Sequence, residues 1–304
     1  MRKVIYILGS LLWSFGSLQA QQAASYAQYM FNGLAINPAY AGSHEVLSAT
    51  VISRFQNVGL EGAPNTQTFS GHAPLFNKNV ALGALFIHDK FGVISQTGAH
   101  LAYAYRIKFG DRKYLSMGAQ AGLISYRANY SQLNQFQSSD PVFQEDIRQM
   151  RPNFGLGAFF TDEKYYIGLS MPHLFNNVFD RGTDLKTVYQ NFPIILTGGY
   201  MLTLTNQLKF KPNLLFKMLD QRPIELDVNA NFLFDEILWA GLSYKIGNAL
   251  NLIVQVQVTD QLSVGYSYAI TTSPIRSVEL GSHEMLLNYR FKYRKYGVIT
   301  PRYF

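Results

Sequence analysis

Apolar and polar residues alternate one by one over long stretches of the chain. The alternation is clearest in residues 97–109, 208–218, 224–234 and 250–258. In the first of these, one set of alternate positions is mainly Leu, Tyr, Ile and Phe, and the other is Gly, Ala, His, Arg and Lys. A period of two places alternate side chains on opposite faces of a β-strand, so the pattern predicts strands with one apolar and one polar face.

The length of these stretches distinguishes a soluble β-sandwich from a transmembrane β-barrel. A soluble sandwich also alternates, but its strands usually have about five or six residues. Here the stretches have about ten residues or more, the length that crosses a bilayer at a tilt. We therefore predict an all-β fold, a transmembrane antiparallel β-barrel of about fourteen strands. The expected strands are 46–55, 65–74, 80–88, 96–108, 114–127, 151–160, 165–171, 193–205, 208–219, 222–234, 237–246, 249–259, 261–271 and 283–293.

The connections between the expected strands alternate in length. The long ones, 128–150, 172–192 and 272–282, all follow odd-numbered strands, whereas connections such as 161–164 and 235–236 follow even-numbered strands. Outer-membrane barrels have short periplasmic turns and longer extracellular loops. If both ends of the chain are periplasmic, the three long connections are extracellular.

The first twenty residues have the features of a cleaved signal peptide. Arg2 and Lys3 precede the apolar stretch 4–15, and Ala20 is a small residue at the expected cleavage site. A spanning helix needs about 20 apolar residues, so this stretch is too short for an anchor. We predict export and a multi-pass barrel in the bacterial outer membrane.

Composition agrees with a barrel and argues against several other classes. Only 15% of residues are charged, against about 25% in ordinary domains, and 14% are aromatic. The net charge of +7 is dispersed along the chain, whereas a nucleic-acid site needs clustered Lys and Arg. The chain has no cysteine, which excludes disulfides, thiolate metal sites, a cysteine nucleophile and a lipid-modified cysteine.

No motif in the chain points to catalysis. A nucleophile elbow, a P-loop and a dinucleotide-binding glycine pattern are all absent. The sequence Gly-Ser-His-Glu occurs twice, at 42–45 and 281–284, and two His-Glu pairs could share a metal ion. The expected topology puts the pairs at opposite rims, so we predict no metal, cofactor or catalytic residue, and no enzyme.

An outer-membrane acylase is the alternative, but it needs a Ser-His site with a third orienting group, and the remaining histidines are scattered. These are His72, His88, His100 and His173.

Short motifs along the chain resemble those of one known family. Residues 28–32 (QYMFN) followed by 36–42 (INPAYAG) are similar to the opening signature of the PorP/SprF family of type IX secretion system membrane proteins. The resemblance covers nearly the whole mature chain, and the order and spacing of its pieces make it specific. The other pieces are Arg54–Gln56, Pro64–Thr68, Ala81–Gly83, Tyr166–Ser170, Lys211–Asn213, Asp227–Asn231 and Trp239–Tyr244.

This resemblance implies an outer-membrane barrel of Bacteroidetes-type bacteria that serves type IX secretion and the related gliding machinery. It implies a role in delivering or retaining particular surface proteins, often large adhesins. The implied partners are outer-membrane lipid, periplasmic and outer-membrane secretion components, and a secreted adhesin as client. The family has no agreed catalytic residues. A second functional class stays open, a diffusion channel or hydrophobic-solute transporter, because other fourteen-stranded barrels have that function.

The segment before the first strand is too long and too apolar for a simple lead-in. We predict that it is ordered inside the lumen or against the periplasmic mouth, since its aromatic side chains would be costly to leave in water. It would act as a plug or as a docking face for a partner. The candidate residues are Tyr29, Phe31, Asn37, Pro38 and Tyr40. The expected divisions are a signal peptide (1–20), a periplasmic or plug segment (21–45), the barrel (46–293) and a tail (294–304).

Overall fold

The structure is a computed structural model, and it describes most of the chain. The described residues are 26–75, 79–110, 113–132, 146–175, 177–180, 186–190, 193–219 and 223–291. The expected signal peptide and the expected tail both lie outside these residues.

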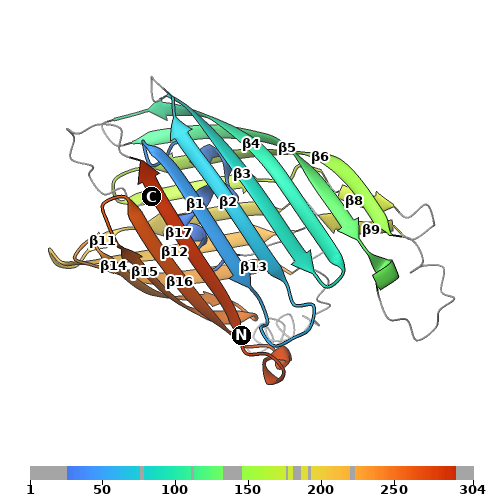
Figure 1. The fold of residues 1–304 in the computed structure, drawn as a ribbon. Helices are drawn as coiled ribbons and strands as arrows, with labels where there is room; N and C mark the ends of the chain where they lie inside the picture. The colour runs from blue at the N-terminus through green and yellow to red at the C-terminus, as the bar shows by residue number, and fades with distance from the viewer. Residues whose placement is uncertain are drawn as a thin grey trace, which may run out of the picture.

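Fourteen antiparallel strands form a closed barrel, in which each strand pairs with its neighbours along the chain (Figure 1). β1 closes the wall against β17, and β10 pairs directly with β12. A short β11 continues β10 after an interruption at Met201. Closure leaves no free long edge around the ring. The strands of the wall are β1 (Leu47–Phe55), β2 (Asn65–Pro74), β3 (Val80–Phe91), β4 (Ile94–Lys108), β5 (Tyr114–Ala128), β6 (Ile147–Thr161), β7 (Tyr165–Met171), β10 (Ile194–Tyr200) with β11 (Leu202–Thr203), β12 (Leu208–Met218), β13 (Glu225–Phe234), β14 (Leu238–Lys245), β15 (Ala249–Gln257), β16 (Leu262–Thr271) and β17 (Ser282–Phe291).

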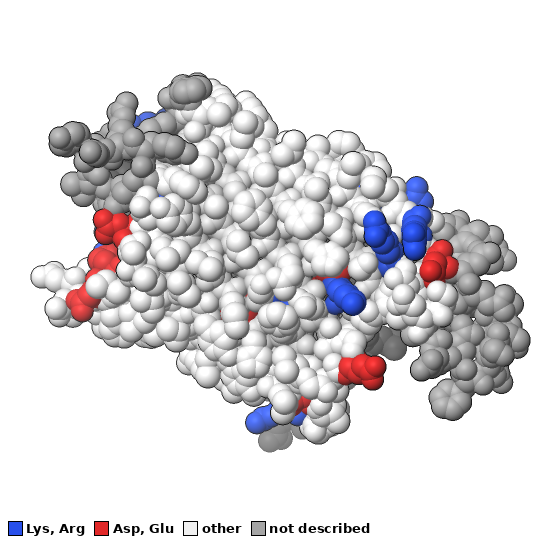
Figure 2. All heavy atoms as spheres, viewed as in Figure 1, with Lys and Arg blue, Asp and Glu red and all other residues white. Residues whose placement is uncertain are grey.

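The two faces of the wall differ as the alternation predicts. In β4, His100, Ala102 and Arg106 are buried toward the lumen, whereas Leu101 and Tyr103 are exposed on the outer face. Figure 2 shows a broad uncharged surface over this side of the barrel, with charged side chains gathered toward its two ends. An outward apolar band between polar ends is typical of a membrane-spanning barrel. Within the described residues, no helix is long and apolar enough to cross a membrane.

The two mouths of the barrel differ in the length of their connections. One mouth, here called the long-loop mouth, has the connections after odd-numbered strands of the wall, including 56–64, 129–146, 172–193 and 272–281. The other, the short-turn mouth, has only brief turns. These are 75–79, 109–113, 162–164, 204–207, 235–237 and 258–261.

All fourteen expected strands are present, but some bounds and one element differ. β5 and β6 reach Ala128 and Ile147, so the expected loop 128–150 is shorter. Their extension is stabilised by a small cluster of buried side chains at the tip, which includes Tyr126, Tyr130 and Ile147. The expected loop 172–192 contains a hairpin that the sequence analysis missed, β8 (Asn177–Asp180) and β9 (Lys186–Gln190).

Residues 26–45, here called the lumen segment, cross the inside of the barrel in one pass (Figure 1). The Tyr26 hydroxyl is 2.8 Å from Thr68 Oγ1, near the long-loop mouth. Gly42 donates its N–H to His72 Nδ1 at 3.1 Å, near the short-turn mouth, where β1 begins. The described part of the segment therefore runs from the long-loop mouth to the short-turn mouth, and the two chain ends lie outside the described residues. Hydrogen-bonding groups at both mouths hold the segment along the length of the lumen.

Candidate functional site: the lumen segment

The lumen segment consists of three single-turn 3₁₀-helices, η1 (Tyr29–Phe31), η2 (Gly33–Ala35) and η3 (Pro38–Tyr40). Pro38 suits the first position of η3, and the Asn37 side chain caps it by accepting a hydrogen bond from the Ala39 N–H at 2.9 Å. Helices this short are not stable alone, because nucleating a helix costs more free energy than the hydrogen bonds of a single turn recover. The barrel wall must therefore supply most of the stabilisation.

The end of the segment at the long-loop mouth is anchored by a buried carboxylate. Glu284 of β17 accepts hydrogen bonds from the backbone N–H groups of Ala27 (3.0 Å) and Gln28 (2.9 Å). The same carboxylate forms an ion pair with Arg54 of β1 at 2.7 Å, and its side chain is 1% exposed. Three donors thus satisfy a charge that would otherwise be very costly to bury.

The middle of the segment lies directly on the wall. Asn37 donates to the Ala158 carbonyl at 3.0 Å, and the Ser170 hydroxyl donates to the Ile36 carbonyl at 2.7 Å. The approach depends on glycine, because a Cβ at Gly118 would lie 2.6 Å from the Pro38 carbonyl carbon. Only a residue without a Cβ allows two backbones to come this close. The contact is therefore backbone on backbone and admits no larger side chain.

The end at the short-turn mouth is held by aromatic and basic side chains. The Tyr40 hydroxyl is 3.1 Å from His44 Nε2, and the Tyr40 ring packs edge-on against His72 with centroids 5.6 Å apart. Arg290 lies 3.4 Å from His44 Nε2, and Arg106 lies 4.0 Å from Glu45. The first Gly-Ser-His-Glu sequence thus ends the segment here. The second supplies Glu284 at the opposite mouth, so neither forms a metal site.

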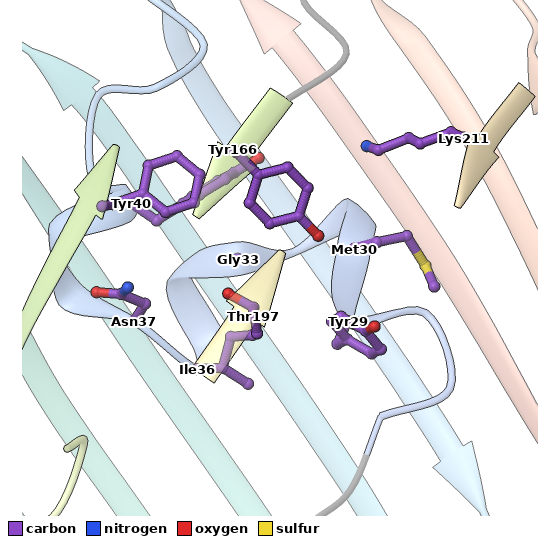
Figure 3. A pocket seen from close by; sticks show the side chains of 10 residues that line it. Tyr29, Met30, Gly33, Ile36, Asn37, Tyr40, Tyr166, Thr197 and Lys211 are labelled. Atoms are coloured by element: carbon purple, nitrogen blue, oxygen red, sulfur yellow. The ribbon is translucent and has the colours of Figure 1, made fainter. Parts of the chain in front are cut away.

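A small cavity of about 20 Å³ remains beside the segment, toward β7, β10 and β12 (Figure 3). Tyr29, Tyr40, Tyr166 and Lys211 are among its lining residues. The Lys211 ammonium lies 5.6 Å from the Tyr166 ring centre and 5.7 Å from that of Trp239, a cation–π arrangement. This volume holds about one water molecule, so the cavity is no passage.

The tyrosines of the segment stay neutral at ordinary pH. Burial raises the pKa of Tyr29 well above its usual value, and burial also raises the pKa of Tyr40. Desolvation disfavours the charged phenolate in both cases. The neutral Tyr29 hydroxyl accepts a hydrogen bond from the Asn229 side chain of β13 at 3.0 Å.

The five candidate residues are all inside the barrel, in two groups. Tyr29 and Phe31 contact β13 and β14, where the rings of Phe31 and Trp239 lie 5.7 Å apart. The other three lie against β4, β5 and β6. Sequence analysis missed the wall residues that hold them, namely Arg54, His72, Gly118 and Glu284. Glu284 stood in the repeated Gly-Ser-His-Glu sequence, but its partners are more than 200 positions away along the chain.

The described residues contain no group of three or more His, Asp or Glu side chains that could hold a metal ion. His100 and His173 lie together, with ring centroids 6.2 Å apart, but Asn153 accounts for their polar contacts. The polar side chains described above hold the lumen segment in the barrel.

The closed wall, the apolar outer band and the neighbours of this fold define an outer-membrane β-barrel protein. The model of the family described as type IX secretion system membrane protein PorP/SprF matches residues 18–289. The chain belongs to this family.

Solved outer-membrane proteins are similar to this chain. Outer membrane protein Omp33 of Acinetobacter baumannii is 8% identical over 81% of this chain and 98% of that one, with a TM-score of 0.51. At this identity, the similarity to Omp33 shows the barrel fold alone. The Ralstonia pickettii toluene transporter TbuX is 11% identical over 89% of this chain and 96% of that one, with a TM-score of 0.49. No curated protein matches the chain.

The orientation of the barrel is testable by cysteine labelling, because the chain has no cysteine of its own. Single cysteines at the exposed positions Glu61 and Arg276, at the long-loop mouth, should react with an impermeant maleimide on intact cells. A cysteine at exposed Asp235, at the short-turn mouth, should react only after the outer membrane is permeabilised. The opposite pattern of labelling would show that the barrel is inserted the other way round, with the long-loop mouth in the periplasm.

Proposed function

We propose that this protein is a non-enzymatic component of the type IX secretion and gliding machinery in the outer membrane. It supports the delivery or surface retention of specific secreted proteins. The observation that carries the proposal, beside membership of the family, is the lumen segment, which runs inside the barrel from one mouth to the other.

A filled lumen limits how the protein can act. While residues 26–45 stay in place, they stand in the path of a folded client or an extended chain through the barrel. The segment is tied at both mouths and in the middle, so displacing it would break contacts in all three places. The protein therefore acts through its two mouths and its outer wall. Periplasmic secretion components dock at the short-turn mouth, and a secreted surface protein is held at the long-loop mouth.

Within this proposal the lumen segment is a plug that also forms part of the short-turn mouth. Tyr29, Phe31, Asn37 and Pro38 pack inside and stabilise the barrel. Tyr40, with His44 beside it, lies at the end of the segment nearest the proposed docking face.

Deletion of the gene tests this function. Cells without the protein should lose one or a few large proteins from their surface, and a plasmid copy of the wild-type gene should restore them. The uptake of small solutes should not change. An unchanged set of surface proteins together with impaired uptake of a small or hydrophobic solute would instead establish the channel or transporter.

A further inference from the structure

Three cationic side chains form a row on the outer wall near the long-loop mouth. Lys90 of β3, Arg127 of β5 and Arg148 of β6 are all exposed on the outer face. Lys90 pairs with Ser95 of β4, Ser95 pairs with Arg127, and Arg127 pairs with Arg148. The four residues therefore occupy one line across four adjacent strands. Lys90, Arg127 and Arg148 are here called the basic row.

This arrangement is unfavourable without an anion. Arg127 and Arg148 are directly opposite on paired strands, where Cβ atoms lie about 5 Å apart and like charges repel. Lys90 lies one strand farther along, across Ser95. Among the described residues, no ion pair neutralises any member of the row. Asp89, next to Lys90, points inward and accepts a hydrogen bond from the Thr66 hydroxyl at 2.6 Å. The row therefore presents its charge to whatever surrounds the barrel.

The apolar band begins just below the row. Met150, two positions from Arg148, is 62% exposed, and Leu101 farther down is 71% exposed. Phe86 lies four positions before Lys90 on the same face. With a rise of about 3.3 Å per residue and a tilt near 40°, this puts the row about 10 Å above Phe86. The row therefore lies toward the long-loop mouth from the apolar band, on the side where lipid headgroups would lie in the proposed orientation. Figure 2 shows basic side chains, with acidic ones beside them, at one end of the visible face, beyond the uncharged surface.

We propose that the basic row binds the phosphorylated headgroup of an outer-leaflet glycolipid of the lipid A type. Arg and Lys are the side chains that bind phosphate most strongly, and three in line can hold two phosphate groups of one headgroup. A lipid is favoured over a soluble acidic protein because the row lies on the wall directly above the lipid-facing band. The inference rests on the orientation of the barrel and is independent of the secretion role.

The test uses the full mature chain, purified in detergent micelles, with lipid A as the probe. Native mass spectrometry counts the lipid A molecules retained by the wild type and by the triple variant Lys90→Gln, Arg127→Gln, Arg148→Gln. We expect the variant to lose binding about tenfold to a hundredfold. The matched control is Lys108→Gln, Lys113→Gln, Lys164→Gln at the short-turn mouth, which should bind as the wild type does.

Further measurements distinguish lipid A from other phosphate-bearing or acidic ligands that the basic row could bind. Millimolar inorganic phosphate should not displace lipid A, and a dephosphorylated lipid A should bind equally weakly to the wild type and the triple variant. The charge-preserving variant Arg127→Lys, Arg148→Lys should retain most of the binding, and heat-modifiable migration on gels confirms that each variant is folded. Equal lipid A binding by the wild type and the row variant would overturn the proposal. Displacement by free phosphate would also overturn it, and displacement by an acidic peptide would assign the row to a protein partner instead.

Discussion

Replacing Glu284 by alanine should destabilise the barrel by about 3–5 kcal/mol, because it leaves a buried arginine without its carboxylate. Arg54 is only 12% exposed, and among the described residues no second carboxylate forms an ion pair with it. The backbone N–H groups of Ala27 and Gln28 would lose their acceptor at the same time. The measurement is the urea midpoint of the folded barrel in micelles, followed by heat-modifiable migration.

The control for this change is Glu236→Ala. Glu236 pairs with Lys209 at the short-turn mouth, but its side chain is 38% exposed, and ion pairs of that kind contribute about 0–1 kcal/mol. Its urea midpoint should stay close to that of the wild type. If Glu284→Ala shifts the midpoint no more than Glu236→Ala does, the carboxylate is not the anchor of the lumen segment.

Replacing Gly118 by valine should expel the lumen segment from a barrel that still folds. The new Cβ would overlap the backbone of Pro38 and Ala39, which no rotamer change can relieve. Valine otherwise suits a strand, so the wall itself should form. Limited chymotrypsin digestion should then cleave after the tyrosines of residues 26–40 in most variant molecules and spare the wild type.

The neighbouring residue supplies the matched control. Ala119 faces outward and is exposed, so Ala119→Val places the same final side chain on the other face of β5. It should leave both the digestion pattern and the migration unchanged. Protection of residues 26–40 in folded Gly118→Val would show that the close contact with η3 is not required.

The barrel was predictable because one local rule repeats in every strand. In β4 or β15, a single alternation specifies both the strand and its face, so the sequence predicted all fourteen strands of the wall. Tertiary packing changed the ends. Tyr126 and Ile147 meet across β5 and β6 and extend both strands beyond the expected bounds. The β8–β9 hairpin was missed because its residues lie in a stretch without clear alternation.

The sequence predicted which residues of the lumen segment are buried, but it did not predict the direction in which the segment crosses the barrel. Tyr29, Phe31 and Tyr40 required burial on hydrophobic grounds alone, and Pro38 indicated a fixed turn. The direction of the segment depends on Glu284 at one mouth and on His72 and Arg290 at the other. These contacts join positions far apart in the chain. The spacing of residues along the sequence does not predict such contacts, because they form only when the strands close into a barrel.

Single-channel recording in planar bilayers tests most directly whether the lumen is filled. The purified wild-type barrel should insert without opening a steady conductance, because residues 26–45 occupy the lumen between the two mouths. The Gly118→Val barrel should conduct ions under the same conditions, and Ala119→Val should behave as the wild type does. A steady conductance from the wild type at low voltage, equal to that of Gly118→Val, would contradict the account.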